Sequence, residues 1–220
     1  MGSIVILALI ALTSIFVPMF WPHGIEDASW ENILVPPGTA DWHWFGTDAN
    51  GRDLLVRTFY GGRISLTIGL LTTVVALVIG VTYGAVAGFV GGRTDGFMMR
   101  FVDVLYSLPL IFFIIILVTV FGRNIFLVFI AIGAVEWLTM SRIVRGQPLT
   151  VKAKEYVESA VAIGLSRGAI LRRYIIPNVL GPVIIYDTLL HPTHIIVESY
   201  LSFLGLGVQE PLTSWGLLIS

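Results

Sequence analysis

Long apolar stretches restrict what this chain can fold into more than any other feature of its sequence. A helix needs about 20 apolar residues to cross the core of a bilayer. Four stretches fit a span well, namely residues 3–20, 64–90, 101–121 and 125–140, and a fifth, residues 175–206, is long but carries polar residues. Hydrophobic residues make up 56% of the chain and charged residues only 12%. A soluble fold of this size cannot bury so much apolar surface, so the sequence predicts a membrane protein.

The spans are expected to be helices. Lipid cannot satisfy unpaired backbone groups, and the alternating pattern of a membrane β-barrel is missing from the sequence. We therefore predict an all-α, polytopic transmembrane helical bundle with five spans. Residues 1–20 could instead be a signal peptide, but they lack a basic start and a clear cleavage site, which favours an uncleaved first span.

The positions of Lys and Arg predict the orientation of the chain. Residues 142–173 hold seven of the thirteen basic residues. Basic loops stay in the cytoplasm, which places the N-terminus inside and residues 21–63 outside, on the periplasmic face. The expected organisation is a first span at 1–20, an external segment at 21–63 and a membrane core at 64–220 with a cytoplasmic segment at 142–177. Five spans leave the C-terminus outside, and we expect a sixth span to be missing from this sequence.

Charge and cysteine content exclude several classes of function. The 13 Lys and Arg balance the 14 Asp and Glu, which gives no reason to expect nucleic-acid binding. Cysteine is absent, so the sequence has no disulfide framework and no thiolate site. It also has no G-x-x-x-x-G-K-[ST] run, so these residues cannot cradle the phosphates of ATP in that way.

The external segment is rich in tryptophan and proline. Its tryptophans are Trp21, Trp30, Trp42 and Trp44. Because tryptophan is common at bilayer edges, the favoured interpretation is a loop that lies along the membrane surface. The alternative is a docking surface for an external partner.

Small residues recur at every fourth position of the second stretch. They are Ala76, Gly80, Gly84 and Gly88. This spacing puts them on one helix face, and such a face lets two membrane helices approach closely. We predict a helix-packing surface there.

The fifth stretch carries a stripe of ionisable residues on one helix face. The stripe consists of Asp187, His191, His194 and Glu198. Ionisable groups at membrane depth normally face protein or a water-filled cavity. Three interpretations stay open: a polar wall of a translocation pathway, a metal site or proton relay, and a structural network between helices. Pro182 and Pro192 in the same stretch are expected to bend or break it.

The cytoplasmic segment is too polar to span the membrane and has the pattern of two short helices. Residues 154–163 are amphipathic, with Tyr156, Val157, Ala160 and Ile163 expected on the packed side. Gly164 permits a left-handed turn, and Ser166 is a candidate N-cap for a second helix over 167–176 that ends at Pro177. A rigid protrusion that binds a cytoplasmic partner is one interpretation. A helix pair on anionic lipid is the other.

Several of these runs resemble a known family. Glu158-Ser-Ala160, with Gly164 and then Pro177, is similar to the "EAA" loop of permease subunits in binding-protein-dependent ABC importers, with Ser159 and Ile176 as mild departures. The resemblance extends to the peptide-permease C-type subunits, and is closest to the oligopeptide permease C subunit. It is carried by Phe45-Gly-Thr-Asp48, Gly51-Arg-Asp53, Gly62-Arg-Ile-Ser-Leu66, Glu198 to Gly207, Gln209-Glu-Pro211 and Ser214-Trp-Gly216.

The resemblance implies a type I ABC importer permease fold in a bacterial inner membrane. The chain would form half of the peptide pathway with a second, homologous permease subunit, and an external substrate-binding protein would deliver the substrate. Two ATPase subunits would hold ATP and Mg, so this chain is expected to have no catalytic residue, cofactor or metal of its own. The ATPase-coupling loop would be Glu158, Ala160, Gly164, Ser166, Arg167 and Pro177, and the stripe residues are the candidates for the pathway.

Other functions stay open at this point. A nickel or other small-solute permease of the same family is one alternative. A secondary transporter or channel would explain the stripe but not the cytoplasmic segment, and the spans show no internal repeat. An intramembrane enzyme would need a nucleophile or metal ligands, for which only His191 and His194 are candidates.

Overall fold

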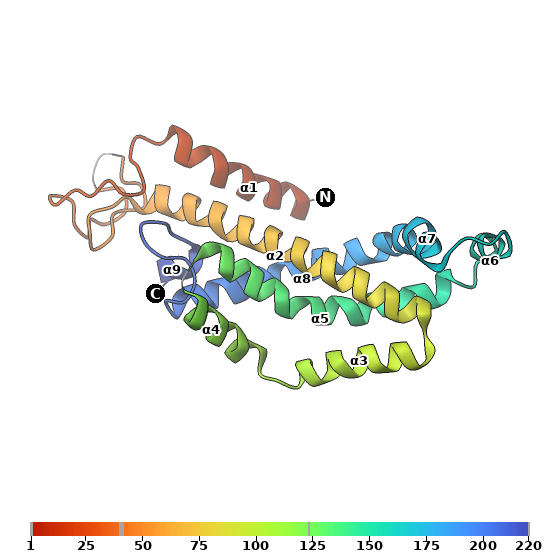
Figure 1. Cartoon of the computed structure of the whole chain (residues 1–220). Helices are drawn as coiled ribbons and strands as arrows, with labels where there is room; N and C mark the ends of the chain where they lie inside the picture. Colours follow the sequence, from red (N-terminus) through yellow and green to blue (C-terminus); the bar gives the residue numbers. More distant parts are fainter. Residues whose placement is uncertain (1, 40–41, 123, 220) are drawn as a thin grey trace. The chain divides into compact units, whose positions relative to one another are not determined.

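The computed structural model describes residues 2–39, 42–122 and 124–219, and its regular structure there is helical (Figure 1). Two isolated antiparallel bridges, Ala28 with Arg52 and Thr47 with Asp53, join parts of the loop between the first two helices. The helices are α1 (Gly2–Phe20), α2 (Leu54–Val90), α3 (Gly92–Tyr106), α4 (Leu110–Phe121), α5 (Ile125–Val151), α6 (Glu155–Ala162), α7 (Arg167–Ile170), the π-helical turn η1 (Leu171–Ile175), α8 (Ile176–Phe203) and α9 (Trp215–Ile219).

Three helical segments of the described chain are long and apolar enough to cross a membrane. They are Leu54–Val90, Ile125–Val151 and Arg167–Phe203. The pair Gly92–Tyr106 and Ile111–Phe121 makes a fourth if it is counted as one bent span, and Ile4–Phe20 is a shorter apolar helix. The predicted all-helical architecture with several candidate membrane spans is therefore confirmed, and the predicted number of five spans stays a prediction.

Helix α2 begins at Leu54, before the apolar stretch that starts at residue 64. Asp53 explains this start, because its Oδ1 accepts the backbone N–H of Val56 over 2.8 Å and so caps the first turn. The last residues of the predicted external segment thus form the first turns of α2.

The predicted third span, residues 101–121, is not one straight helix. It is broken between Tyr106 and Leu110, and the two helices on either side differ in direction by 78°. Pro109 explains the break, because its ring disfavours the helical conformation of the residue before it.

The sequence predicted that the second cytoplasmic helix ends at Pro177, but the structure shows that it continues. Helix α7 continues through η1 into α8, so one helical segment runs from Arg167 to Phe203. The π-helical turn ends at Ile175, two residues before Pro177, and a local π-type adjustment is one of the ways in which a helix accepts a proline. Pro182 and Pro192 also lie inside α8 and do not break it.

Contacts divide the chain into two compact units. The first contains Met1–Gly69, Phe121–Val128 and Ile195–Ser220, and the second contains Leu70–Val120 and Phe129–His194. In the second unit, buried residues of α2, α5, α6 and the α7–α8 segment form one apolar core, which includes Val81, Ala85, Met140, Val144, Val157, Ala160, Ile170 and Ile175.

Candidate functional site

The loop between α6 and α7 ends α6 with a left-handed turn at Gly164. The φ angle of Gly164 is +81°, in the region that side chains with a Cβ rarely adopt. Its N–H donates to the carbonyl of Val161 over 3.0 Å, and the N–H of Leu165 donates to the carbonyl of Ala160 over 3.1 Å. These two bonds form a Schellman motif, which satisfies the last carbonyls of the helix.

Helix α6 has one face in the core and one face exposed. Val157 and Ala160 are buried in the core of the second unit, whereas Glu158 is exposed. The sequence prediction was wrong for two residues of the packed side, since Tyr156 is 42% exposed and Ile163 is 74% exposed. Ile163 lies beyond the last helical residue, Ala162, so helical periodicity does not apply to it.

The other residues of the predicted coupling loop follow α6 in the sequence. Ser166 is the N-cap of α7, and its hydroxyl accepts the N–H of Ala169 over 3.3 Å. Arg167 and Pro177 are exposed. A cavity of about 430 Å³ lies between the end of α2 and this loop, lined by Phe89, Val90, Val161, Leu165, Arg167 and Ile170.

The small-residue face of α2 lies against α5. A Cβ atom on Gly80 would come within 2.6 Å of the Cβ of Met140, and one on Gly84 within 2.4 Å of the carbonyl oxygen of Ser141. A Cβ on Gly88 would likewise overlap the carbonyl oxygen of Arg145, and Ala76 is buried. The two backbones therefore approach at a distance that only glycine permits.

Sequence reasoning did not single out the residue of α5 that complements this face. A Cβ on Gly133 would lie 2.7 Å from the side chain of Val75 in α2. A single glycine has no spacing pattern, so the sequence offered no signal for it.

Two ion pairs join α3 to α5 in the second unit. Arg145 donates from Nε and Nη2 to the two carboxylate oxygens of Asp95, each over 2.6 Å. Arg142 donates to Asp103 over 2.7 Å. The two-pronged geometry of the first pair fixes orientation as well as distance, and it holds the short helix α3 against α5.

Two histidines of the stripe share one hydroxyl of α2. Thr73 Oγ1 lies 3.2 Å from His191 Nδ1 and 3.1 Å from His194 Nδ1. A hydroxyl has a single proton to donate, so at least one of these imidazoles carries its proton on Nδ1. His194 Nε2 also lies 3.8 Å from Glu136 Oε2, and Asp187 Oδ1 is buried with no hydrogen-bond partner in this structure.

Glu198 has different surroundings, in the first unit. It is fully buried, and its two carboxylate oxygens accept hydrogen bonds from Ser65 over 2.9 Å and from Ser202 over 2.7 Å. The same hydroxyls accept the backbone N–H groups of Trp215 and Val208. Glu198 therefore connects α2, α8 and the segment that leads into α9, and it does not share partners with the histidines.

Tryptophans cluster where α1 meets the loop that follows it. The ring of Trp21 meets those of Trp42 and Trp44 edge-on, with centroids 5.7 Å and 5.0 Å apart. A cavity of about 470 Å³ lies beside them, lined almost entirely by apolar groups of Phe16, Val17, Phe20, Trp21, Trp44, Phe45, Leu55 and Phe59. Trp30 is 80% exposed and lies outside this cluster.

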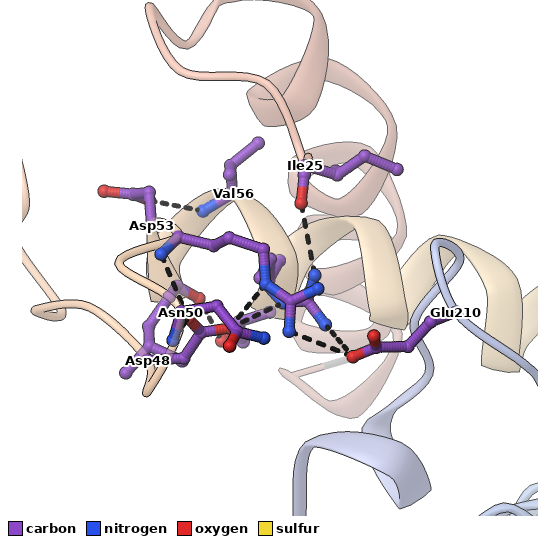
Figure 2. A network of polar contacts seen from close by, with 10 residues as sticks. Ile25, Asp48, Asn50, Asp53, Val56 and Glu210 are labelled. Carbon is purple, nitrogen blue, oxygen red and sulfur yellow. Dashed lines mark hydrogen bonds and ion pairs between the residues drawn. The ribbon is translucent and has the colours of Figure 1, made fainter. Parts of the chain in front are cut away.

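The runs at Asp48 and Glu210 meet in one polar network of the first unit (Figure 2). Arg52 donates from Nε to Asp48 Oδ2 over 2.8 Å and from Nη2 to Glu210 Oε1 over 2.9 Å. Arg57, which is almost fully buried, donates to the carbonyl of Ile25 over 3.1 Å. The network joins the loop after α1 to the segment before α9.

The charge of Asp48 is stabilised by this network. Burial alone would raise the pKa of Asp48, but the N–H groups of Arg52 and Asn50 and the guanidinium of Arg52 outweigh it and lower the pKa below its ordinary value. Sequence reasoning recognised the runs that contain these residues but assigned them no role, because the partners are more than 150 residues apart.

Comparison with known proteins matches this architecture to a class of membrane transport components. Residues 80–220 match the family described as "Binding-protein-dependent transport system inner membrane component". The whole chain is 53% identical to the oligopeptide transport system permease protein OppC of Haemophilus influenzae and covers 70% of that protein. It is 51% identical to OppC of Escherichia coli K12 and 42% identical to the dipeptide transport system permease protein DppC of Bacillus subtilis, of which it covers 72% and 68%.

The fold and these matches define a helical permease component of the inner membrane. The chain belongs to the binding-protein-dependent transport system inner membrane component family. Such a component is a permease and not the catalytic subunit of its system, in agreement with the expectation from the sequence.

Proposed function

We propose that this chain is a permease subunit of an ATP-driven oligopeptide importer and forms half of its pathway, with a second permease subunit forming the other half. Its identity of more than 50% to two oligopeptide permease proteins, over the full chain, supports this substrate class. The family description supports an external binding protein as a partner. ATP and Mg are held by two ATPase subunits in this proposal, and membrane lipid surrounds the spans.

The proposed topology has five crossings and a cytoplasmic N-terminus. The crossings are α1, α2, the bent pair α3 and α4, α5, and the α7–α8 segment. The distribution of Lys and Arg supports this assignment, because basic segments stay in the cytoplasm. Residues 91–100 and 142–173 hold nine of the thirteen basic residues, and this topology places both segments in the cytoplasm.

The observation that carries the coupling role is the double-sided geometry of α6. Glu158 and the apolar side chains of Val161 and Ile163 face outward, while Val157 and Ala160 lie in the core with residues of α2, α5 and α8. A partner that displaces the exposed face therefore moves the core directly. This is the property that an ATPase-coupling loop requires, and the rigid turn at Gly164 keeps the displacement from being absorbed locally.

The pathway role belongs to Asp187, His191 and His194 in this proposal, and Glu198 is assigned to structure. The two carboxylates of the stripe differ in their hydrogen-bond partners. Glu198 has both oxygens hydrogen-bonded in a closed network, whereas Asp187 has an oxygen with no partner in this structure. A buried polar atom without a partner is costly unless water or a substrate group reaches it.

The experiment is uptake by proteoliposomes that contain this chain, its partner permease and the ATPase subunits, with the binding protein added outside. We expect ATP-dependent uptake of a labelled oligopeptide that is lost when any one component is omitted, and no ATP hydrolysis by this chain alone. Uptake of radioactive nickel instead of peptide would establish the alternative permease function. Peptide flux without the ATPase subunits, driven by an ion gradient, would contradict the proposal.

A further inference from the structure

Three potential metal ligands converge in the first unit, in the loop between α1 and α2. His23 follows the end of α1, Asp53 precedes the start of α2, and His43 lies between them in the sequence. Each offers one ligand atom, and these atoms all lie within 4.8 Å of one another. Among the described residues, this is the group of histidines and carboxylates that meets this criterion; the stripe on α8 does not.

The core of this cluster is buried and already oriented. His43 and Asp53 are 5% and 1% exposed, and His43 Nδ1 lies 2.7 Å from Asp53 Oδ2. The other oxygen of Asp53 is fixed by the N–H of Val56 (Figure 2). Proteins commonly orient a ligand carboxylate with a second hydrogen bond of this kind.

His23 provides the observation that points to a ligand. Its ring stacks on that of His43, with centroids 4.4 Å apart, and its Nε2 atom is buried without a hydrogen-bond partner in this structure. A buried imidazole nitrogen with no partner is costly, and coordination to a cation would satisfy it. His23 as a whole is only half-buried, so its ring has more freedom to turn than that of His43.

We propose that His23, His43 and Asp53 bind a divalent transition-metal ion of the zinc class. Two imidazoles and one carboxylate suit Zn²⁺ or Ni²⁺ and not Mg²⁺, which prefers oxygen ligands. With metal–ligand bonds of about 2.0–2.2 Å, His43 Nδ1 and Asp53 Oδ2 separate to about 3.3 Å around the ion, and the ring of His23 turns out of its stack. The ion takes the place of the hydrogen bond between His43 and Asp53, any proton on the coordinating atoms is released to solvent, and water fills the fourth position.

The bound ion would connect the end of α1 to the start of α2. Because the native chain holds the three ligands together and the unfolded chain does not, the ion stabilises the folded state in proportion to its binding. The site uses none of the residues of the stripe or of the α6–α7 loop, so its failure would leave the proposed transport function untouched.

The test uses the full chain, purified in detergent without a histidine tag and stripped with EDTA. We expect calorimetry to show one Zn²⁺ bound per chain, with a rise in the thermal unfolding midpoint that Mg²⁺ does not produce. His23→Gln should weaken binding at least about tenfold, as should Asp53→Asn. Glu31→Gln, which changes an exposed carboxylate of the same loop, should bind as the unchanged chain does.

His23→Gln is the decisive variant, because His23 takes no part in the His43–Asp53 hydrogen bond or in the cap of α2. Circular dichroism of the metal-free variant checks that it is folded. Lack of stoichiometric Zn²⁺ binding by the unchanged chain at 1 mM would overturn the proposal. So would binding that survives His23→Gln but is lost in His191→Ala, since that would move the ion to α8.

Discussion

Ser65 of α2 donates a hydrogen bond to Glu198 of α8 over 2.9 Å, although 133 residues separate the two in the sequence. Glu198 is fully buried, and its second oxygen accepts from Ser202. Both of these partners are neutral hydroxyls, so hydrogen bonds and not an ion pair offset the free-energy cost of burying the Glu198 side chain.

Glu198→Ala should therefore destabilise the protein. Loss of the carboxylate leaves two buried hydroxyls without an acceptor, and each costs about 1–3 kcal/mol. Glu198→Gln should cost less, because its amide still offers an oxygen to Ser65 and an N–H to Ser202. Thermal unfolding midpoints of the unchanged chain and of the two variants check this order of stability. A double-mutant cycle of Glu198→Ala with Ser65→Ala measures the coupling energy between the two side chains. Additive effects of the two changes would show that the bond contributes nothing to stability.

Asp187 and His191 should behave differently from Glu198. If they line a hydrated pathway, Asp187→Asn and His191→Ala change transport but leave the yield of assembled complex near normal. Size-exclusion chromatography gives the yield, and peptide uptake gives the transport rate. A loss of yield in both single variants that the double variant restores would identify a structural pair instead, since breaking a buried pair costs about 3–5 kcal/mol.

Gly84→Leu should prevent assembly by forcing α2 away from α5. Even a Cβ at this position would lie 2.4 Å from the carbonyl of Ser141, so a leucine side chain has no room. Overpacking of this kind costs about 1–3 kcal/mol or more. Gly181→Leu in α8 is the matched control, because nothing lies within 4 Å of its Cβ position. The yield of folded protein in detergent compares the two, and equal yields would remove the packing role of the α2 face.

Gly164→Val should uncouple ATP hydrolysis from uptake. The conflict is conformational and not spatial, because φ is +81° and nothing lies within 4 Å of a Cβ at this position. We expect normal membrane insertion with a large loss of coupled uptake in reconstituted complexes. Gly146→Val in α5 provides the comparison, since that position is equally open and needs no positive φ. Normal coupling of ATP hydrolysis to uptake in Gly164→Val would show that this glycine only separates α6 from α7.

Asp48→Asn should lower stability at neutral pH but not in acid. The pKa of Asp48 is lowered in the folded protein, so its contribution is fully present above its unfolded pKa of about 3.9 and is lost as the pH falls through the lower folded value. The difference between the two unfolding midpoints should therefore shrink as the pH is lowered below about 4. Glu31→Gln, which changes an exposed carboxylate of the same loop, is the control variant measured at each pH. A constant difference across this range would mean that Asp48 acts through shape and not through charge.

Local patterns predicted much of the architecture. The apolar stretches predicted membrane helices, and the four-residue spacing of Ala76, Gly80, Gly84 and Gly88 predicted a close-packing face. The amphipathic pattern of residues 154–163 predicted the position of α6, and Gly164 predicted the turn that follows it. Each of these depends on neighbours within a few turns, where helical periodicity and backbone sterics act directly.

Other features depended on contacts that the sequence does not display. The helix through Pro177 needed a π-helical turn, and the break before Pro109 separated what hydropathy presented as one span. The stripe on α8 looked uniform in sequence, yet Glu198 bonds to Ser65 while His191 and His194 share Thr73. The meeting of His23, His43 and Asp53 has no periodicity at all.

By itself, the sequence determined that this protein lies in a membrane, that its chain is helical and to which family it belongs. Hydrophobicity and helical periodicity can be read from short segments of sequence. An apolar segment that crosses a bilayer forms a helix because lipid cannot satisfy unpaired backbone groups. Only the tertiary structure decided which polar side chains meet. Hydrogen bonds and ion pairs act over about 3 Å, and the distances between residues far apart in the sequence exist only after the chain has folded.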